Sequence, residues 1–288
     1  YWGENGDIKD ILADVYLSRI AISSYTRMSD WAQSVIDYEK SPPGGNWMEK
    51  LVLIGADSHR TGDAATQCDY LYDKYLNTAF QETDKLYENG GTIQKSDLTD
   101  SLNSGAGYVN FIDHGGPTVW CQNGGNQVLL NNNDVASLTN GRKKPLVSGM
   151  ACMTSWFDNP SGCGYQNFGD CIGETFTENA QNRAIAYIGS SRSATAAIGY
   201  NSYTYGAGGL QEDLCYQLGL DNLHIGSAHT EAKDHYAYSF GNWFPDTEES
   251  EGEIQSCWLE LNMLGEPEVP LWTKVPKTFQ VNVTVTQQ

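Results

Sequence analysis

Short apolar runs alternate along this chain with stretches in which apolar residues recur at helical spacing. Runs bounded by Gly or polar residues predict buried strands, which cover residues 51–55, 108–112, 145–151 and 184–189. Helical spacing predicts helices over residues 28–38, 66–80, 95–102, 134–138, 170–179 and 208–218. Because strands separated by helices are typical of βαβ units, the pattern predicts an α/β fold with a largely parallel central sheet flanked by helices.

Three segments rich in Gly, Asn, Pro or acidic residues predict loops at 122–133, 159–167 and 245–252. The pattern changes after Trp272, where a polar stretch leads into alternating residues 279–286 that are typical of a strand. We therefore expect an α/β domain over residues 1–272, and a linker or the start of a truncated β-domain over residues 273–288.

The chain has 36 acidic and 17 basic residues, which gives a net charge of -19. Such a charge repels phosphate backbones and anionic membranes, so we exclude a nucleic-acid partner. No stretch approaches the roughly 20 apolar residues of a membrane-spanning helix. The first residues are polar and include no initiator Met, which indicates a mature or excised piece with neighbouring domains in a longer precursor.

Seven cysteines match no zinc-binding spacing. An odd number in an acidic, Lys-poor chain favours a secreted or cell-surface protein in which six cysteines form three disulfides and Cys152 stays free. The alternative is a cytosolic protein with seven reduced, mostly buried cysteines. The pairing of the six cysteines is not fixed by the sequence.

Two predicted strands end in side chains that thiol chemistry requires. His114 follows the strand over residues 108–112, and Cys152 ends the run over residues 145–151. The carboxyl ends of parallel strands meet at one edge of a sheet, so an imidazole and a thiol are expected there together. Cys152 would attack a carbonyl, His114 would move protons, and the amides of Gly115 and Cys152 would hold the oxyanion. The alternative is a core His and a packed Cys.

A third strand end supplies a carboxylate. Asp57 follows the strand over residues 51–55 and could accept the second N–H of the imidazole. The alternative role for Asp57 is an ordinary cap or turn residue.

Six blocks of the sequence together resemble the gingipain family of cysteine peptidases, within the caspase-like clan. They include Asp113-His114-Gly115 and Met150-Ala151-Cys152, and they occur in the order of the family. Two positions depart from the family pattern, because Ser18 stands in place of Gly and Glu266 in place of Asp. The blocks cover residues 13–20, 53–57, 109–115, 147–152, 184–191 and 261–267.

This resemblance implies a caspase-like three-layer fold and a secreted cysteine endopeptidase that acts on proteins or peptides. It implies Cys152 as the nucleophile that forms a thioester, His114 as acid and base, Asp57 as the acidic residue behind the imidazole, and Gly115 as an oxyanion donor. In this clan the thiol and imidazole flank the scissile bond, and no cofactor is needed for catalysis. Two other functions stay open, namely a non-catalytic surface recognition module of the same fold and a sorting or maturation transpeptidase.

Candidate substrate residues come partly from the same resemblance. Gingipains cut after Arg or Lys through an acidic pocket residue, and Asp69 is the candidate here, with a solvated helix carboxylate as the alternative. Segment 191–205, including Ser191 and Tyr200, is expected to form a pocket wall. Trp120 and Trp156 each follow a catalytic candidate closely and are expected in the cleft, although ordinary packing explains them equally well.

Calcium is the ion that the sequence favours. Glu4 and Asp7 lie in a short run that resembles an oxygen-ligand loop, and a second acidic cluster spans residues 246–251. Neither has full EF-hand spacing, and the alternative is a set of solvated acidic side chains.

Overall fold

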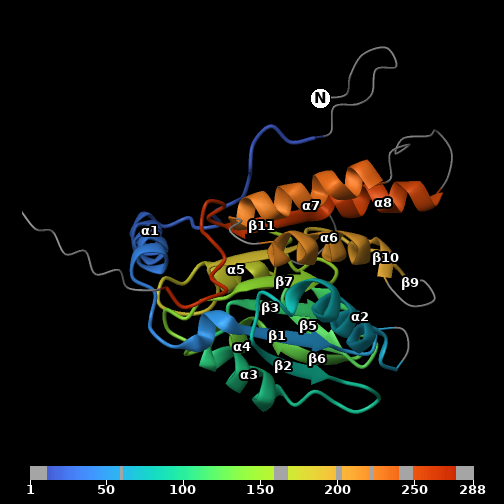
Figure 1. The fold of residues 1–288 in the computed structure, drawn as a ribbon, viewed down its shortest axis with the longest axis horizontal. Helices are drawn as coiled ribbons and strands as arrows, with labels where there is room; N and C mark the ends of the chain where they lie inside the picture. Colours follow the sequence, from blue (N-terminus) through green and yellow to red (C-terminus); the bar gives the residue numbers. More distant parts are fainter. Residues whose placement is uncertain are drawn as a thin grey trace, which may run out of the picture.

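A six-stranded sheet forms the centre of the computed structural model, which describes residues 12–58, 61–158, 168–198, 203–220, 224–239 and 249–276 (Figure 1). The strand order is β11-β8-β7-β3-β1-β2, and every neighbouring pair is parallel except β11 and β8. These strands are β1 (Lys50–Gly55), β2 (Glu82–Tyr87), β3 (Tyr108–Ile112), β7 (Leu146–Met150), β8 (Ala186–Ser190) and β11 (Leu261–Gly265). The predicted α/β fold with a largely parallel sheet is confirmed.

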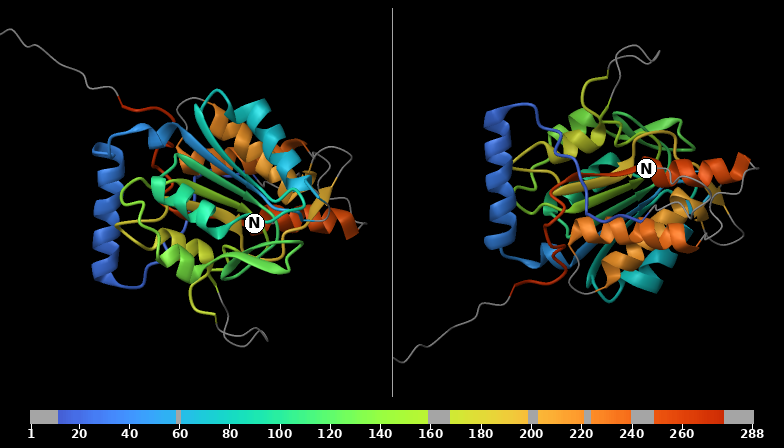
Figure 2. Two further views of the ribbon diagram at one scale, coloured as in Figure 1. Left: turned by 90° about the horizontal axis from the view of Figure 1, so that it is seen from below. Right: turned by 90° about the horizontal axis from the view of Figure 1, so that it is seen from above.

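Alternation along each strand divides the buried side chains between two cores. Leu51 and Leu53 of β1 belong to one core, whereas Val52 and Ile54 belong to the other. Helices that contribute to the first core include α2 (Asp63–Leu71), α6 (Ala207–Gly219), α7 (Ile225–Ser239) and α8 (Glu249–Glu260). Helices on the opposite face are α3 (Lys95–Ser104), α4 (Asn132–Ala136) and α5 (Ile172–Thr177). The sheet is thus the middle of three layers, as the views along it show (Figure 2).

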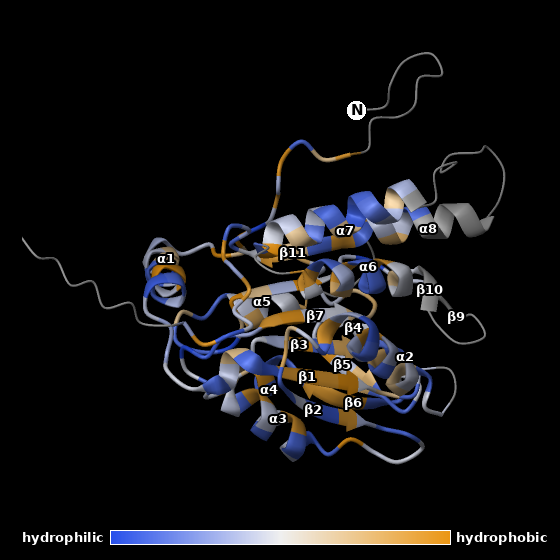
Figure 3. Ribbon diagram, in the orientation of Figure 1, coloured by the Kyte–Doolittle hydropathy of each residue, from blue (hydrophilic) through white to orange (hydrophobic). Residues whose placement is uncertain are grey.

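Hydropathy follows this layering. The central strands are the most hydrophobic part of the ribbon, and the outer helices are largely hydrophilic (Figure 3). Strand β2 is an exception, because it lies at the edge of the sheet and none of its residues is fully buried. Polar residues therefore suffice for β2, and its sequence lacks the apolar run that marks the central strands.

Helix α1 (Tyr25–Lys40) lies across the end of the sheet where the parallel strands begin (Figure 1). Lys144, just before β7, is 2% exposed and donates to Ser34 Oγ at 2.8 Å and to the Asn179 carbonyl at 2.7 Å. This buried amine therefore ties α1 to the sheet.

The smaller elements are a 3-10 helix (Asn46–Glu49), a π-helical turn (Tyr72–Leu76), a sheet of β4 (Gly115–Gly116), β5 (Val119–Gln122) and β6 (Gln127–Asn131), and the pair β9 (Ala196–Ile198) and β10 (Tyr203–Gly206).

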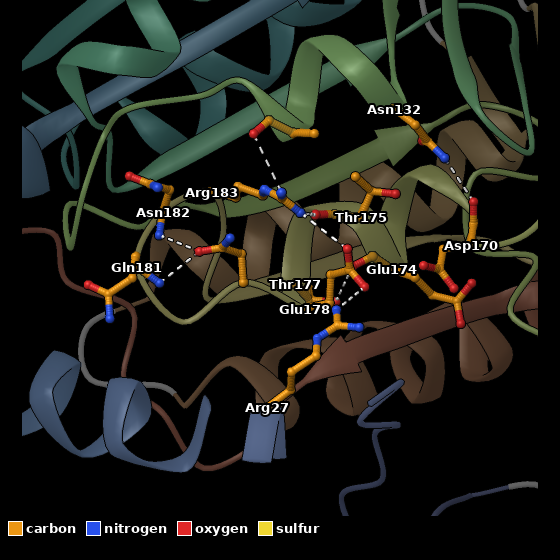
Figure 4. A network of polar contacts seen from close by, with 12 residues as sticks. Arg27, Asn132, Asp170, Glu174, Thr175, Thr177, Glu178, Gln181, Asn182 and Arg183 are labelled. Carbon is orange, nitrogen blue, oxygen red and sulfur yellow. Dashed lines mark hydrogen bonds and ion pairs between the residues drawn. The ribbon is translucent and has the colours of Figure 1, made fainter. Parts of the chain in front are cut away.

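A polar network also holds this end of the molecule together (Figure 4). The Arg183 guanidinium, 8% exposed, donates to the Thr175 carbonyl at 2.6 Å and lies 3.3 Å from Glu178 Oε1. The other oxygen of Glu178 pairs with Arg27 of α1. One carboxylate thus joins the segment before β8 to α1.

The four predicted strands match β1, β3, β7 and β8 to within two residues. Two predicted loops contain regular structure, because segment 122–133 includes β6 and segment 245–252 overlaps the start of α8. The acidic residues that suggested a loop there favour the first turn of a helix, since its free amides carry partial positive charge. Segments 159–167 and 279–286 lie outside the residues described.

All six cysteines in the described part of the chain are free thiols, so the predicted disulfides are absent there. Four of them pack as small apolar residues in the two cores, namely Cys68, Cys171, Cys215 and Cys257. Cys163 lies outside the described residues. Among the described helices none is long and apolar enough to cross a bilayer.

Candidate active site

Strand register brings the three catalytic candidates to one edge of the sheet. Ile112 of β3 pairs with Gly55 of β1 on one side and with Met150 of β7 on the other. Asp57, His114 and Cys152 each follow these aligned positions by two residues. Neighbouring strands lie about 4.8 Å apart, so His114 stands between the other two candidates.

Gly115 lets the loops after β3 and β7 approach closely. A Cβ atom at this position would lie 2.9 Å from Ala151 Cβ, 2.9 Å from Thr154 Cγ2 and 3.2 Å from the Cys152 carbonyl oxygen. Only glycine fits there without displacing the loop that carries the thiol. The structure therefore places Gly115 directly against the Cys152 loop.

The imidazole of His114 faces a backbone carbonyl. Its Nε2 atom lies 3.2 Å from the Ser58 carbonyl oxygen. Because a carbonyl oxygen can only accept, this hydrogen bond requires a proton on Nε2, which leaves Nδ1 of the neutral ring as an acceptor. A Cβ atom at Gly125 would lie 3.4 Å from His114 Cγ, so this glycine is close to the imidazole, and the Cys121 amide donates to the His114 carbonyl at 3.0 Å.

Asp57 organises the loops beside this carbonyl. Its Oδ1 accepts the Gly62 amide and its Oδ2 accepts the Gly90 amide, each at 2.6 Å. His114 Nε2 contacts the carbonyl of Ser58, the residue after Asp57, and the role of Asp57 behind the imidazole stays a prediction. Asp57 thus lies at the predicted edge, but both of its oxygens bind backbone amides of the surrounding loops.

The Cys152 thiol is half-buried, and its Sγ donates to the Ala194 carbonyl at 3.4 Å. Burial raises the pKa of this thiol, and the nearby Glu260 carboxylate adds to the increase. A raised pKa favours the protonated thiol over the thiolate at neutral pH. Met153, the next residue, has a left-handed backbone with φ of 61°, and its amide donates to the Arg192 carbonyl at 2.8 Å.

Arg192 joins the loop after β7 to the loop after β8. Its guanidinium binds Asp158 through two bonds of 2.8 and 2.7 Å and donates to the Ser191 carbonyl at 2.7 Å. The guanidinium also stacks 5.1 Å from the Trp156 ring centroid. Trp156 is 4% exposed, so it supports this clamp and presents almost no surface to a substrate.

Two other substrate candidates have structural roles. Trp120 is fully buried, stacks 4.4 Å from Phe111 and donates from Nε1 to the Tyr187 hydroxyl at 3.0 Å. Its ring therefore belongs to the core and does not line the cleft. Asp69 accepts from Lys85 Nζ at 2.7 Å and from the Tyr87 hydroxyl at 2.8 Å. These partners belong to β2, three strands away from β7.

The remaining candidates are distributed between the site and the undescribed residues. Ser191 lies at the end of β8, and its Oγ accepts from Asn262 Nδ2 at 3.1 Å. Tyr200, Glu4 and Asp7 lie outside the described residues. Within the part of the chain that is described, no group of three His, Cys, Asp or Glu side chains is arranged to hold a metal ion.

Sequence reasoning missed two buried carboxylates near the imidazole. Asp113, 6% exposed, accepts the Ser58 hydroxyl at 2.8 Å. Glu88, also 6% exposed, accepts the amides of Asp57 at 2.8 Å and Asn123 at 3.0 Å. Asp113 is next to His114 in the sequence, and this position could have marked it as a site residue. Glu88 follows a polar strand, and nothing in the sequence around it indicates a site.

Proteins of a known peptidase family are similar to this chain. The model of peptidase family C25 matches residues 3–272. Lys-gingipain of Porphyromonas gingivalis is 31% identical over 187 residues, which are 63% of this chain and 10% of the relative. The chain thus spans about a tenth of the length of the curated relatives that it matches.

Solved structures share the fold at lower sequence identity. The Arg-specific cysteine proteinase gingipain R is 16% identical with a TM-score of 0.70, over 91% of this chain and 57% of that one. A complex of the RgpB pro- and mature domains of Porphyromonas gingivalis gives 17% identity and a TM-score of 0.68, over 92% of this chain and 58% of that one. With a family model that covers nearly the whole chain, we conclude that the chain belongs to peptidase family C25, the gingipain family of cysteine peptidases.

Proposed function

We propose that the protein is a cysteine endopeptidase that hydrolyses peptide bonds through a thioester on Cys152. The observation that supports this most strongly is the shared register of β3 and β7, which sets His114 and Cys152 at neighbouring strand ends with Gly115 against the thiol loop. Family membership supports the same reaction class.

The chemistry assigned to each group follows from its environment. Cys152 Sγ loses its proton to Nδ1 of His114, attacks the scissile carbonyl carbon and forms a tetrahedral oxyanion that the Gly115 amide stabilises. The C–N bond then breaks as His114 returns the proton to the leaving amine. Water attacks the thioester, His114 accepts a proton from it, and the acid product leaves as the thiol is restored.

The neutral resting thiol is compatible with this sequence of steps. Because its pKa is raised, we assign proton removal to the substrate-bound state, in which the imidazole and the carbonyl are both in reach. The hydrogen bond from Nε2 to Ser58 keeps Nδ1 unprotonated for that step.

Cys152→Ala tests the proposal. We expect loss of at least about 10³-fold in the cleavage of casein and of a fluorogenic peptide library, because the nucleophile is absent. Cys121→Ala is the matched control, since Cys121 is another half-buried thiol whose pKa is raised by burial, and this variant should keep its activity. Equal cleavage by Cys152→Ala and wild type would reject the proposal.

The setting of the enzyme is part of the same proposal. We propose a secreted or cell-surface protein with protein substrates and with further domains in its precursor, supported by the acidic composition and the family. Transfer of the acyl group to an added peptide amine, seen as a ligated product, would identify the enzyme as a transpeptidase instead.

A further inference from the structure

Ser58 connects a buried carboxylate to the imidazole. Its Oγ donates to Asp113 Oδ1 at 2.8 Å, and its amide donates to Asp63 Oδ1 at 3.1 Å. Its carbonyl oxygen lies 3.2 Å from His114 Nε2. The residue is thus held through its side chain and its amide, and the group left to face the imidazole is its carbonyl.

Asp113 is expected to lower the stability of the folded state at this position. It is 6% exposed, and its Oδ2 atom is buried without a hydrogen-bond partner among the residues that the structure describes. The charged or titratable groups around it are His114 on its own loop, Glu88 after β2 and Cys121 on β5. A buried carboxylate oxygen without a partner destabilises the folded state, so stability alone does not explain Asp113.

The neighbouring carboxylates have different partners. Asp57 binds the amides of Gly62 and Gly90, and Glu88 binds those of Asp57 and Asn123. Both therefore order loop backbone. In contrast, the hydrogen bond given to Asp113 by the Ser58 side chain anchors the residue that contacts the imidazole.

We propose that Asp113 is a positioning residue for His114, because its carboxylate holds the Ser58 hydroxyl and Ser58 then presents its carbonyl to the imidazole. This inference rests on the proposed function, in which His114 moves the protons. The Ser58 carbonyl keeps the neutral ring protonated at Nε2 and fixes its orientation, so that Nδ1 faces the reacting groups. Losing the anchor lets the carbonyl rotate, and small misplacements of catalytic groups cost up to about 10²-fold in rate.

Kinetics of a double-mutant cycle test the connection through Ser58. We expect Ser58→Ala and Asp113→Leu each to lower kcat about 10- to 100-fold with KM nearly unchanged. The kcat of the double variant should be no lower than that of the less active single variant, because both changes break the same link. Asp113→Asn keeps an acceptor for the Ser58 hydroxyl and should retain most of kcat.

A matched pair elsewhere controls for loss of a Ser–Asp hydrogen bond. Ser101 Oγ on α3 donates to Asp84 on β2, at the edge of the sheet. Ser101→Ala and Asp84→Asn should leave kcat within about twofold of wild type. Effects on kcat that multiply in the Ser58 and Asp113 double variant, or a Ser58→Ala variant with wild-type kcat, would overturn the inference.

A spectroscopic measurement separates this inference from the proposed function. Protonated and unprotonated imidazole nitrogens resonate at well-separated frequencies in ¹⁵N NMR, and the His114→Gln variant assigns the signals of His114. We expect Nε2–H in wild type and Asp113→Asn, and a mixture of tautomers in Ser58→Ala and Asp113→Leu. The same tautomer in all four proteins would reject a positioning role even if the protein proves to be a peptidase. The expected pattern in a protein without peptidase activity would reject only the proposed function.

Discussion

At the scale of single residues, the fold disfavours the charged form of Asp113. Burial raises the pKa of this carboxyl to about 6, although the His114 amide and the Ser58 hydroxyl partly oppose the shift. The folded protein therefore binds a proton more tightly than the unfolded chain, in which an Asp has a pKa of about 3.9. The resulting stability is present below about pH 4 and is lost as the pH rises through 6.

Asp113→Asn should consequently change how stability depends on pH. Relative to this variant, wild type should lose about 1.4 kcal/mol of unfolding free energy between pH 5 and pH 7.5, because only wild type releases the proton. Urea unfolding at both pH values measures the difference. Asp84→Asn provides a control of opposite sign, since burial is outweighed there by bonds from Lys50 and Ser101 that lower the pKa of Asp84. Parallel pH curves for wild type and Asp113→Asn would contradict the expectation.

Gly115→Ala should damage the site through contact alone. Its new methyl group meets Ala151, Thr154 and the Cys152 carbonyl at 2.9 to 3.2 Å, so the thiol loop must move. We expect kcat to fall at least about 10-fold and stability to fall by about 1–3 kcal/mol. Gly116→Ala is the neighbouring control, because its methyl group meets only the Val119 side chain, at 3.3 Å. Equal kinetics of the two variants would show that the close approach is not needed.

Side chains at strand ends were predictable from sequence, and their partners were not. His114 and Cys152 follow apolar runs, so strand register alone brings them together. The Ser58 carbonyl is a backbone group, which leaves no trace in residue type. The sequence left both cleft lining and packing open for the two tryptophans, because neighbours distant in sequence, such as Tyr187 for Trp120 and Arg192 for Trp156, decide whether a ring is buried.

At the scale of elements, strands buried on both faces were found and edge elements were missed. β1, β3, β7 and β8 are largely apolar because helices cover both faces of the sheet. β2 was not predicted as a strand, because its position at the edge of the sheet tolerates charged residues and its sequence has no apolar run. α7 packs mainly through Ile225, Ala228, Ala232 and Tyr236, a helically spaced stripe whose alanines give a weak apolar signal.

The two arginines that share Glu178 should differ in their contribution to stability. Arg183→Met should lower the unfolding free energy by about 3 kcal/mol, because it removes the donor to the Thr175 carbonyl and the more buried of the two arginines that pair with Glu178. Arg27→Met should cost less than about 1 kcal/mol, because the Arg27 side chain is 48% exposed. Guanidinium unfolding measures both. The network lies at the opposite end of the strands from Cys152, so kcat of the folded variants should not change. Similar losses of unfolding free energy in the two variants would contradict this ranking.

At the scale of the whole molecule, the net charge of -19 gives the protein a negative long-range field. Such a field attracts cationic substrates over distances that salt limits to about 10 Å at 0.1 M. In the proposed reaction, the charge would therefore influence the rate of encounter, whereas the strand-end geometry would govern the chemical step.

Ionic strength should separate these two effects. For peptides with the same scissile sequence, kcat/KM should fall several-fold between 0.02 and 0.5 M salt when distant flanking residues are Lys, because steering is screened. The same peptides flanked by Glu should show an increase, and kcat should stay constant for both. A salt response that is independent of the flanking charge would refute long-range attraction.

Residues 18–20 cover the outer side of β11. The Arg19 amide donates to the Met263 carbonyl at 3.0 Å, and the Gly265 amide donates to the Arg19 carbonyl at 2.9 Å. Cleavage after Ile20, with release of the preceding fragment, would expose the Met263 carbonyl and the Gly265 amide at the edge of an apolar strand. Exposed strand edges of this kind pair with other chains. The cleaved protein should therefore self-associate while intact molecules stay dispersed, so a single proteolytic cut would turn the edge of β11 into a site of aggregation.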